Sequence, residues 1–298
     1  MKYAWIDKMD DRRLWWFSVA LACELLEVSR SGFYDWRARR GRPATTRQRE
    51  QQLLVAAITV EHIASSYRYG SPRIHAELVD QGWQIGVNRV ARLMALHGLE
   101  GRSGRRRRHS LTKQAKVAPD IPDLIKRDFA AAGPNLKWTT DITYVPTAQG
   151  WLYLAVIIDL YSKAVVGWNA ATHMRVELAT DALSMALGSR RPAPGLIVHS
   201  DRGSQFTSRE WLETLDAADA RASMGRVGVC WDNAPAESWF AGFKNELVHP
   251  IGAFVTSEQA KVEIARYIRW HNTTRRHSAL NMLAPHQWER VDTVAVAA

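Results

Sequence analysis

Hydrophobic and polar residues follow two different patterns along the chain, and the change falls near residue 136. Before it, apolar residues recur at helical spacing. Residues 21–28 and 29–36 predict two short helices joined by a tight turn, with Ser29 as N-cap of the second, and 47–63 predicts a longer helix. A helix-turn-helix and a plain helical hairpin both fit the first pair.

A second helical pair is predicted downstream. Ser71 can cap a helix that has Pro72 at its first position, where proline is tolerated. Gly82 and Gly86 then bracket a turn, and a further helix is predicted over 88–97. This pair is the better candidate for a helix-turn-helix.

Beyond residue 136 the pattern predicts strands and helices in alternation. Alternating or continuous apolar runs rich in β-formers predict strands. The strands are expected over 137–145, 151–159, 164–169, 196–199 and 222–224, and the helices over 176–187, 208–217, from about 233, and over 257–271. Three successive strands followed by alternating helices and strands indicate a mixed sheet with helices on its faces.

The charge of the chain is distributed unevenly. The net charge is +10, yet residues 131–298 hold 16 basic and 16 acidic residues, so the whole excess is N-terminal. Residues 101–116 carry seven basic residues and no acidic one, and four of them are consecutive: Arg105, Arg106, Arg107 and Arg108. Such a block suits a polyanion, because each neutralised phosphate releases counterions; the alternative is a solvated linker.

These patterns together predict three regions. We expect a helical DNA-binding region with helix-turn-helix units over 1–100, a basic linker over 101–130 and an α/β core with a C-terminal helix over 131–298. Arg89 and Arg92 lie on the helix that would enter a major groove. The alternative is a helical pair that packs only against its own domain.

Composition excludes several other classes of protein. No apolar run is long enough to span a membrane, and charges interrupt the first residues before a signal peptide could develop. Cys23 and Cys230 form no zinc-ligand set, so a reducing, cytoplasmic setting near the nucleoid is expected.

Three carboxylates are placed for metal-dependent chemistry. Asp141 lies in the first predicted strand, Asp201 just past the fourth, and Glu237 in the first turn of a helix. Thirty-five residues separate Asp201 from Glu237, enough for a helix, a strand and a loop to bring them together. Phosphodiester chemistry uses such a cluster, because two Mg²⁺ ions about 4 Å apart can activate the attacking oxygen and stabilise the leaving one. Each residue taken alone could equally be an ordinary surface carboxylate.

The helix that begins near residue 233 carries one more candidate. Helical spacing places Glu237, Phe240, Ala241 and Lys244 on one face. Lys244 could then grip a DNA phosphate or base beside the metal site. The alternative is a solvated lysine.

Several sequence strings carry a resemblance to a known family. They are Trp138-Thr-Thr-Asp-Ile-Thr-Tyr144, His199-Ser-Asp-Arg-Gly-Ser-Gln-Phe206 and Asp232-Asn-Ala-Pro-Ala-Glu-Ser238, the last continuing to Lys244. They resemble those of bacterial insertion-sequence transposases in the DDE, retroviral-integrase-like superfamily. Segments around Ser29–Tyr34, Tyr67–Ile74 and His271–Pro285 resemble other parts of the same transposases, so the resemblance covers nearly the whole chain.

The resemblance implies a fold, a cofactor and partners. It implies an RNase H-like catalytic core whose triad is Asp141, Asp201 and Glu237, using two Mg²⁺ ions with Mn²⁺ as a substitute. It also implies insertion-sequence ends and target DNA as partners, a homo-oligomer on the DNA, and an upstream-frame protein that supplies further DNA-binding parts. The chain lacks the His/Cys zinc module of retroviral integrases, and it has no heptad run for a coiled coil.

Two other functions remain open from the sequence. The same carboxylates would serve a plain nuclease of the RNase H-like fold. A DNA-binding regulator of transposition, acting through residues 1–116 without catalysis, belongs to a different class.

Overall fold

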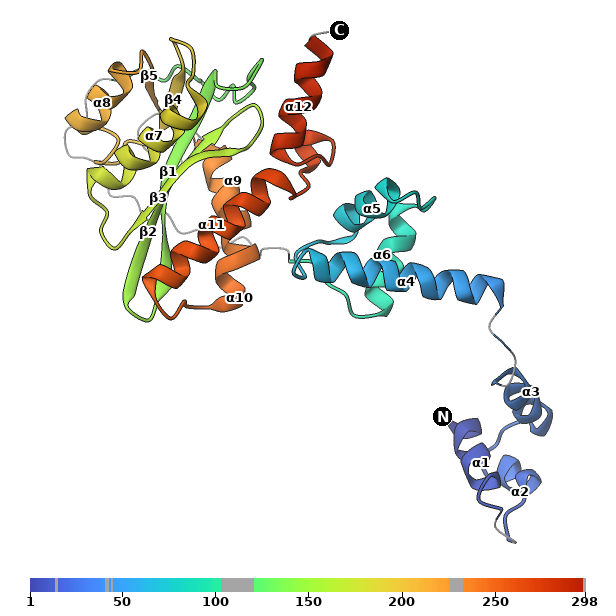
Figure 1. The fold of residues 1–298 in the computed structure, drawn as a ribbon. Helices are drawn as coiled ribbons and strands as arrows, with labels where there is room; N and C mark the ends of the chain where they lie inside the picture. The colour runs from blue at the N-terminus through green and yellow to red at the C-terminus, as the bar shows by residue number, and fades with distance from the viewer. Residues whose placement is uncertain (14–15, 41–42, 44, 103–120, 226–232, 297–298) are drawn as a thin grey trace. The chain divides into compact units, whose positions relative to one another are not determined.

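The computed structural model describes residues 1–13, 16–40, 43, 45–102, 121–225 and 233–296 (Figure 1). The chain divides into two compact units, Met1–Val60 and Glu61–Ala298. The boundary between them falls inside the helix α4 (Thr46–Ala64). Within the described ranges, no helix is both long and apolar enough to cross a membrane.

The first unit is helical. Before α4 it contains α1 (Lys2–Asp10), α2 (Val19–Leu25) and α3 (Arg30–Arg40). Its small core is formed by Ile6, Ala22, Cys23 and Phe33. The predicted cap of α3 is confirmed, because the Gly32 amide donates to the Ser29 hydroxyl at 3.2 Å.

The second unit begins with the second predicted helical pair, α5 (Ser71–Asp80) and α6 (Val87–Leu96). Gly82 occupies the turn with φ +90°, a conformation that favours glycine. The predicted cap at Ser71 is wrong: Gly70 is the N-cap, with extended backbone, and Ser71 is already helical. Proline fits anywhere in the first turn, because the amides there have no partner inside the helix, so Pro72 did not fix the cap position.

A five-stranded mixed sheet forms the centre of the second unit (Figure 1). Its strands are β1 (Lys137–Thr147), β2 (Gly150–Asp159), β3 (Val165–Ala171), β4 (Ile197–Ser200) and β5 (Arg221–Met224). The order across the sheet is β3-β2-β1-β4-β5. The first three strands are antiparallel, and β4 and β5 continue parallel to β1. The predicted α/β class with a mixed sheet is confirmed.

Helices cover both faces of the sheet (Figure 1). One apolar core includes residues of α7 (Val176–Arg190) and α8 (Arg209–Asp216). The other includes residues of α9 (Ala234–Phe243), the π-helical segment η2 (Lys244–Val248) and α11 (Ser257–Thr273). The remaining elements are α10 (His249–Ile251), the 3-10 turn η3 (Ser278–Leu280) and α12 (Pro285–Val296).

Strand β2 is apolar almost throughout because both of its faces are covered. Leu154 and Val156 lie in the core on the α9 and α11 side, whereas Ala155 and Ile157 lie in the core on the α7 side. A strand buried on both faces reads as a continuous apolar run.

The outer strand β3 is held by a side chain. The Asn272 amide accepts from the Val165 amide at 2.9 Å and donates to the Val165 carbonyl at 2.8 Å. It therefore satisfies backbone groups at a sheet edge that would otherwise be exposed.

Gly167 permits a close approach between β3 and α7. A Cβ atom there would lie 2.2 Å from the Ala182 carbonyl oxygen and 2.7 Å from the Ala186 Cβ. We expect Gly167→Ala to lower the free energy of unfolding by about 1–3 kcal/mol, because helix and strand must move apart. Urea unfolding of the purified chain measures this.

Gly188 provides the matched control inside α7. A Cβ atom added there meets nothing within 4 Å, so Gly188→Ala should be neutral or stabilise by about 0.5–1 kcal/mol. Equal effects of the two substitutions would show that the close approach at Gly167 does not constrain the fold.

Candidate active site

The register of the sheet places Asp141 and Asp201 next to each other. The parallel strands β1 and β4 pair through Thr139 and His199. Asp141 and Asp201 each come two residues later, so they lie next to each other along two adjacent strands, Asp141 inside β1 and Asp201 just past the end of β4. Asp201 directly follows the last residue of β4, and its Oδ1 accepts from the Gly203 amide at 2.9 Å.

A buried asparagine attaches to β1 the helix that carries the third carboxylate. Asn233, the N-cap of α9, accepts from the Thr139 hydroxyl at 2.5 Å and donates to the Thr140 carbonyl at 3.0 Å. The start of α9 is thereby attached to β1 directly before Asp141. Glu237 lies in the first turn of α9, as predicted.

The charges of these side chains influence the protonation of Asp141. Burial raises the pKa of Asp141 to about 8, and the negative charges of Asp201 and Glu237 raise it as well. The Ile142 amide and the Lys244 ammonium act in the opposite direction. Partial burial also raises the pKa of Glu237. Asp141 therefore lies within interaction range of all three other predicted residues.

Lys244 lies beside the carboxylates on an aromatic ring. Its ammonium is 4.7 Å from the centre of the Tyr144 ring, and its partial burial lowers its pKa while Asp141 raises it. Tyr144 in turn meets Trp151 edge-on at 4.7 Å between ring centres. Phe240, predicted on the same helical face, is buried in the core.

The donor set suits a hard divalent cation, because carboxylate oxygens are the ligands that Mg²⁺ prefers. Nevertheless, no group of three or more His, Cys, Asp or Glu side chains in the described ranges is arranged to hold a metal ion. Mutually repelling carboxylates favour separation when no cation lies between them. The metal role of Asp141, Asp201 and Glu237 therefore stays a prediction.

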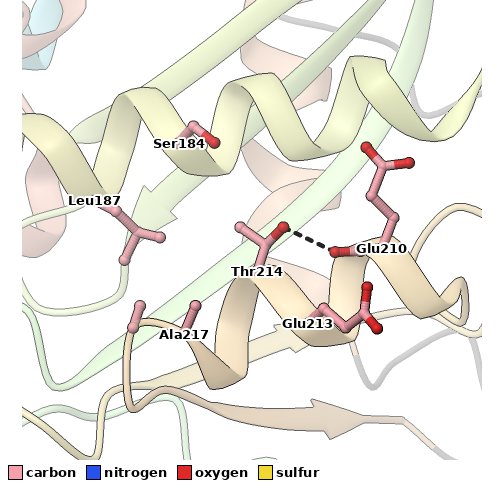
Figure 2. A pocket seen from close by; sticks show the side chains of 7 residues that line it. Ser184, Leu187, Glu210, Glu213, Thr214 and Ala217 are labelled. Carbon is pink, nitrogen blue, oxygen red and sulfur yellow. Dashed lines mark hydrogen bonds between the residues drawn. The ribbon is translucent and has the colours of Figure 1, made fainter.

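A hollow elsewhere on the second unit is not part of this site. Figure 2 shows it between α7 and α8, where Ser184, Leu187 and Thr214 are among the lining residues. Its carboxylates, Glu210 and Glu213, belong to α8 and not to the predicted triad.

The predicted DNA-contacting arginines precede the carboxylates in the sequence. Arg89 and Arg92 are exposed on α6, while Val90, Leu93 and Met94 of the same helix are buried. The outward face of α6 therefore carries both arginines. The block Arg105–Arg108 lies outside the described residues.

Sequence patterns indicated no role for Asn233 or Tyr144, although both stand inside the family-like strings. Their proximity to Asp141 and Lys244 depends on a contact between β1 and α9, which are about ninety residues apart. Helical or strand periodicity carries no signal for such a contact.

Known protein families match most of the chain. A family described as "Integrase core domain" matches residues 131–230, and a second family of the same description matches 218–285. A family described as "HTH-like domain" matches residues 48–109. The HTH-like match includes the second predicted helical pair and extends into the predicted linker.

Individual relatives extend over nearly the full length. The transposase InsF for insertion sequence IS3A of Escherichia coli (strain K12) is 40% identical over 97% of this chain and 98% of its own. The insertion element IS600 uncharacterized 31 kDa protein of Shigella sonnei is 38% identical over 88% of this chain and 95% of its own. Among solved structures, the HTLV-2 integrase catalytic core domain in complex with magnesium is 16% identical, covers 54% of this chain and 99% of its own, and has a TM-score of 0.41.

Proposed function

Since the chain belongs to the family of insertion-sequence transposases with an integrase core domain, we propose that Asp141, Asp201 and Glu237 form its metal-dependent catalytic triad. Membership makes the chain a polynucleotidyl transferase. The proposal adds which residues carry the reaction. In this reaction, water attacks a phosphodiester at the element's end, and the freed 3′-hydroxyl attacks a second strand in line.

The triad's part in the reaction is to hold two Mg²⁺ ions, for which Mn²⁺ could substitute. When bound, such ions activate the attacking oxygen and stabilise the leaving one. Asp141 would hold them from inside β1, Asp201 from just past the end of β4, and Glu237 from α9. Asn233 would keep Glu237 in place through its bonds to β1.

One arrangement supports this assignment most strongly. Strand pairing sets Asp141 beside Asp201, and Asn233 attaches the start of α9 to β1. The charges of Asp201 and Glu237 both raise the pKa of Asp141, in keeping with that arrangement. Repulsion between neighbouring carboxylates is relieved when cations bind between them, which accounts for acidic side chains at this place.

DNA binding accompanies this chemistry. The match to the HTH-like domain supports recognition of insertion-sequence ends, with Arg89 and Arg92 on α6 reaching the major groove. The consecutive arginines Arg105–Arg108 would follow the phosphate backbone. A homo-oligomer on the DNA and an upstream-frame protein complete the set of proposed partners.

Two assays test the function. Metal-dependent nicking of DNA that carries the element's ends distinguishes the enzyme from a DNA-binding regulator. Strand joining with a pre-cut 3′ end distinguishes the transposase from a nuclease. Binding without any nicking in Mg²⁺ or Mn²⁺ would contradict the proposal, and nicking without joining would favour the nuclease.

Lys244 should act on DNA engagement and not on metal binding. Its ammonium lies on Tyr144 beside Asp141, where it could contact a phosphate or base. We expect Lys244→Ala to raise the DNA concentration needed for half-maximal joining by about tenfold, the effect of losing one charged hydrogen bond. Activity should return at saturating DNA.

Lys261→Ala on α11 serves as the control for removing a lysine, and it should leave the DNA requirement unchanged. Joining assays over a range of DNA concentrations measure both variants. A Lys244→Ala protein that is inactive at every DNA concentration would instead place Lys244 in the chemical step.

A further inference from the structure

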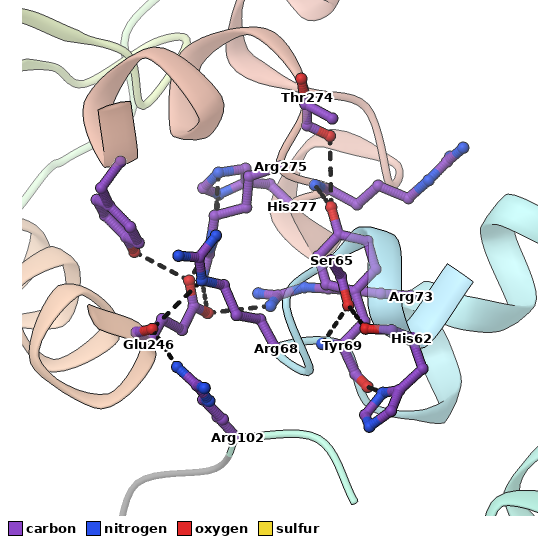
Figure 3. A network of polar contacts seen from close by, with 12 residues as sticks. His62, Ser65, Arg68, Tyr69, Arg73, Arg102, Glu246, Thr274, Arg275 and His277 are labelled. Carbon is purple, nitrogen blue, oxygen red and sulfur yellow. Dashed lines mark hydrogen bonds and ion pairs between the residues drawn. The ribbon is translucent and has the colours of Figure 1, made fainter. Parts of the chain in front are cut away.

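The carboxylate of Glu246 is fully occupied by internal partners. Glu246 lies in η2, two residues after Lys244, and is buried. Figure 3 shows the arginines that surround it. Its two oxygens accept from Arg73 at 3.2 Å, from Arg275 at 2.7 and 2.8 Å, and from the Tyr267 hydroxyl at 2.9 Å. One negative charge thus faces two guanidinium groups and has no lone pair left for others.

Two more arginines converge on the same residue but reach only its backbone. The carbonyl oxygen of Glu246 accepts from Arg102 Nη1 at 2.7 Å and from Arg68 Nε at 3.3 Å (Figure 3). A carbonyl carries no net charge. No carboxylate in the described ranges lies within ion-pair distance of either guanidinium. Each guanidinium therefore keeps donors and a charge that the carbonyl does not compensate.

The backbone holds these two arginines together. The Arg102 amide donates to the Arg68 carbonyl at 3.2 Å. At Gly101 the chain crosses the 69–70 segment so closely that a Cβ atom would lie 2.3 Å from the Gly70 nitrogen. The Arg68 guanidinium also lies 4.6 Å from the centre of the Trp270 ring. The pair is fixed in advance, so a ligand would find it already assembled.

Holding like charges together costs free energy unless an anion relieves it. Burial lowers the pKa of Arg68, and the Arg102 charge adds a smaller lowering, while Tyr267 and Glu246 act in the opposite direction. Guanidinium groups match the geometry of phosphate oxygens and bind them through two parallel hydrogen bonds. Lys244 stands on the same helical segment as Glu246, two residues away in the sequence.

We propose that Arg68 and Arg102 together bind a backbone phosphate of the DNA on which the chain acts. The site joins the HTH-like segment, which contributes both arginines, to the helical segment that carries Lys244. It rests on the proposed function for the identity of the polyanion. Because a phosphate carries no base information, the interaction fixes the position of the DNA and not its sequence.

The test is the salt dependence of DNA binding by the full chain. For Arg68→Gln and for Arg102→Gln, the affinity for a duplex of random sequence should fall by about tenfold at low salt. The slope of log K against log salt concentration should become shallower by about 0.9 for each phosphate that the variant no longer neutralises. Arg102→Lys should keep the wild-type slope, because it retains the charge.

The control is Arg209→Gln, which removes the same charge from an exposed pair with Glu213 on α8. Its slope should match that of the wild type. Wild-type slopes in both Arg68→Gln and Arg102→Gln would overturn the proposal. An equal reduction of the slope in Arg102→Gln and Arg102→Lys would also overturn it, since a purely structural role would need the guanidinium shape and not its charge. Binding slopes require no chemistry, so their outcome is independent of whether the chain joins strands.

Discussion

Replacing Glu237 with glutamine is expected to reduce DNA cleavage and strand joining together, by about 10²-fold or more. The substitution keeps the shape of the side chain but removes one charge from the carboxylates around Asp141. Metal ions would then be held poorly, so attacking and leaving oxygens would lose stabilisation in the same step. Loss of a single preorganised stabilising group has effects of this size. Nicking and joining assays in Mg²⁺ measure both reactions.

Two comparisons make this result specific. Glu258→Gln makes the same chemical change in the first turn of α11 and should leave both reactions at the wild-type level. DNA binding by Glu237→Gln should persist, and a slight gain is expected because one negative charge has left the path of the phosphates. Normal cleavage and joining by Glu237→Gln would remove the catalytic assignment and favour a DNA-binding regulator.

Much of the sheet could be predicted because the apolar pattern of each strand reflects how that strand is buried. Residues 151–159 are almost entirely apolar, and the structure buries both faces of β2. Short apolar runs at 196–199 and 222–224 correspond to β4 and β5. These signals are local, because burial on one or both faces of a strand determines which consecutive residues are apolar. By contrast, α1 and α12 were not predicted.

The role of an acidic residue was harder to predict than its strand. Asp141 and Asp159 both lie in apolar strands, and the two strands are paired. Asp159 accepts from the amides of Asn135, Tyr161 and Ser162 and from the Trp138 indole, so it is a satisfied structural carboxylate. Asp141 has the amide of Ile142 and repelling carboxylates around it. The family-like strings distinguished the candidate Asp141 from the structural Asp159, whereas the strand pattern alone could not.

The arginine cluster around Glu246 could not be predicted from any sequence pattern. Arg73, Glu246 and Arg275 come from α5, from η2 and from the segment after α11. Their contact depends on how the HTH-like segment packs on the core. The π-helical turn that presents Glu246 has no propensity signal, because π-helices are rare and short. Such a buried, charged contact is visible only once the fold is known.

Glu246→Gln is expected to lower the free energy of unfolding by about 3–5 kcal/mol. Arg275 is 9% exposed and would keep its charge without a carboxylate, and Arg73 would lose the same partner. Removing one partner of a buried ion pair has this effect, because the remaining charge is desolvated without compensation.

Glu263→Gln is the control. It breaks the pair with the exposed Arg266 on α11 and should change stability by no more than about 0.5 kcal/mol. Urea unfolding compares the two variants under the same conditions. If both variants lose equally little stability, Glu246 does not hold the HTH-like segment against the catalytic core, and the arginines around it are attached by other contacts.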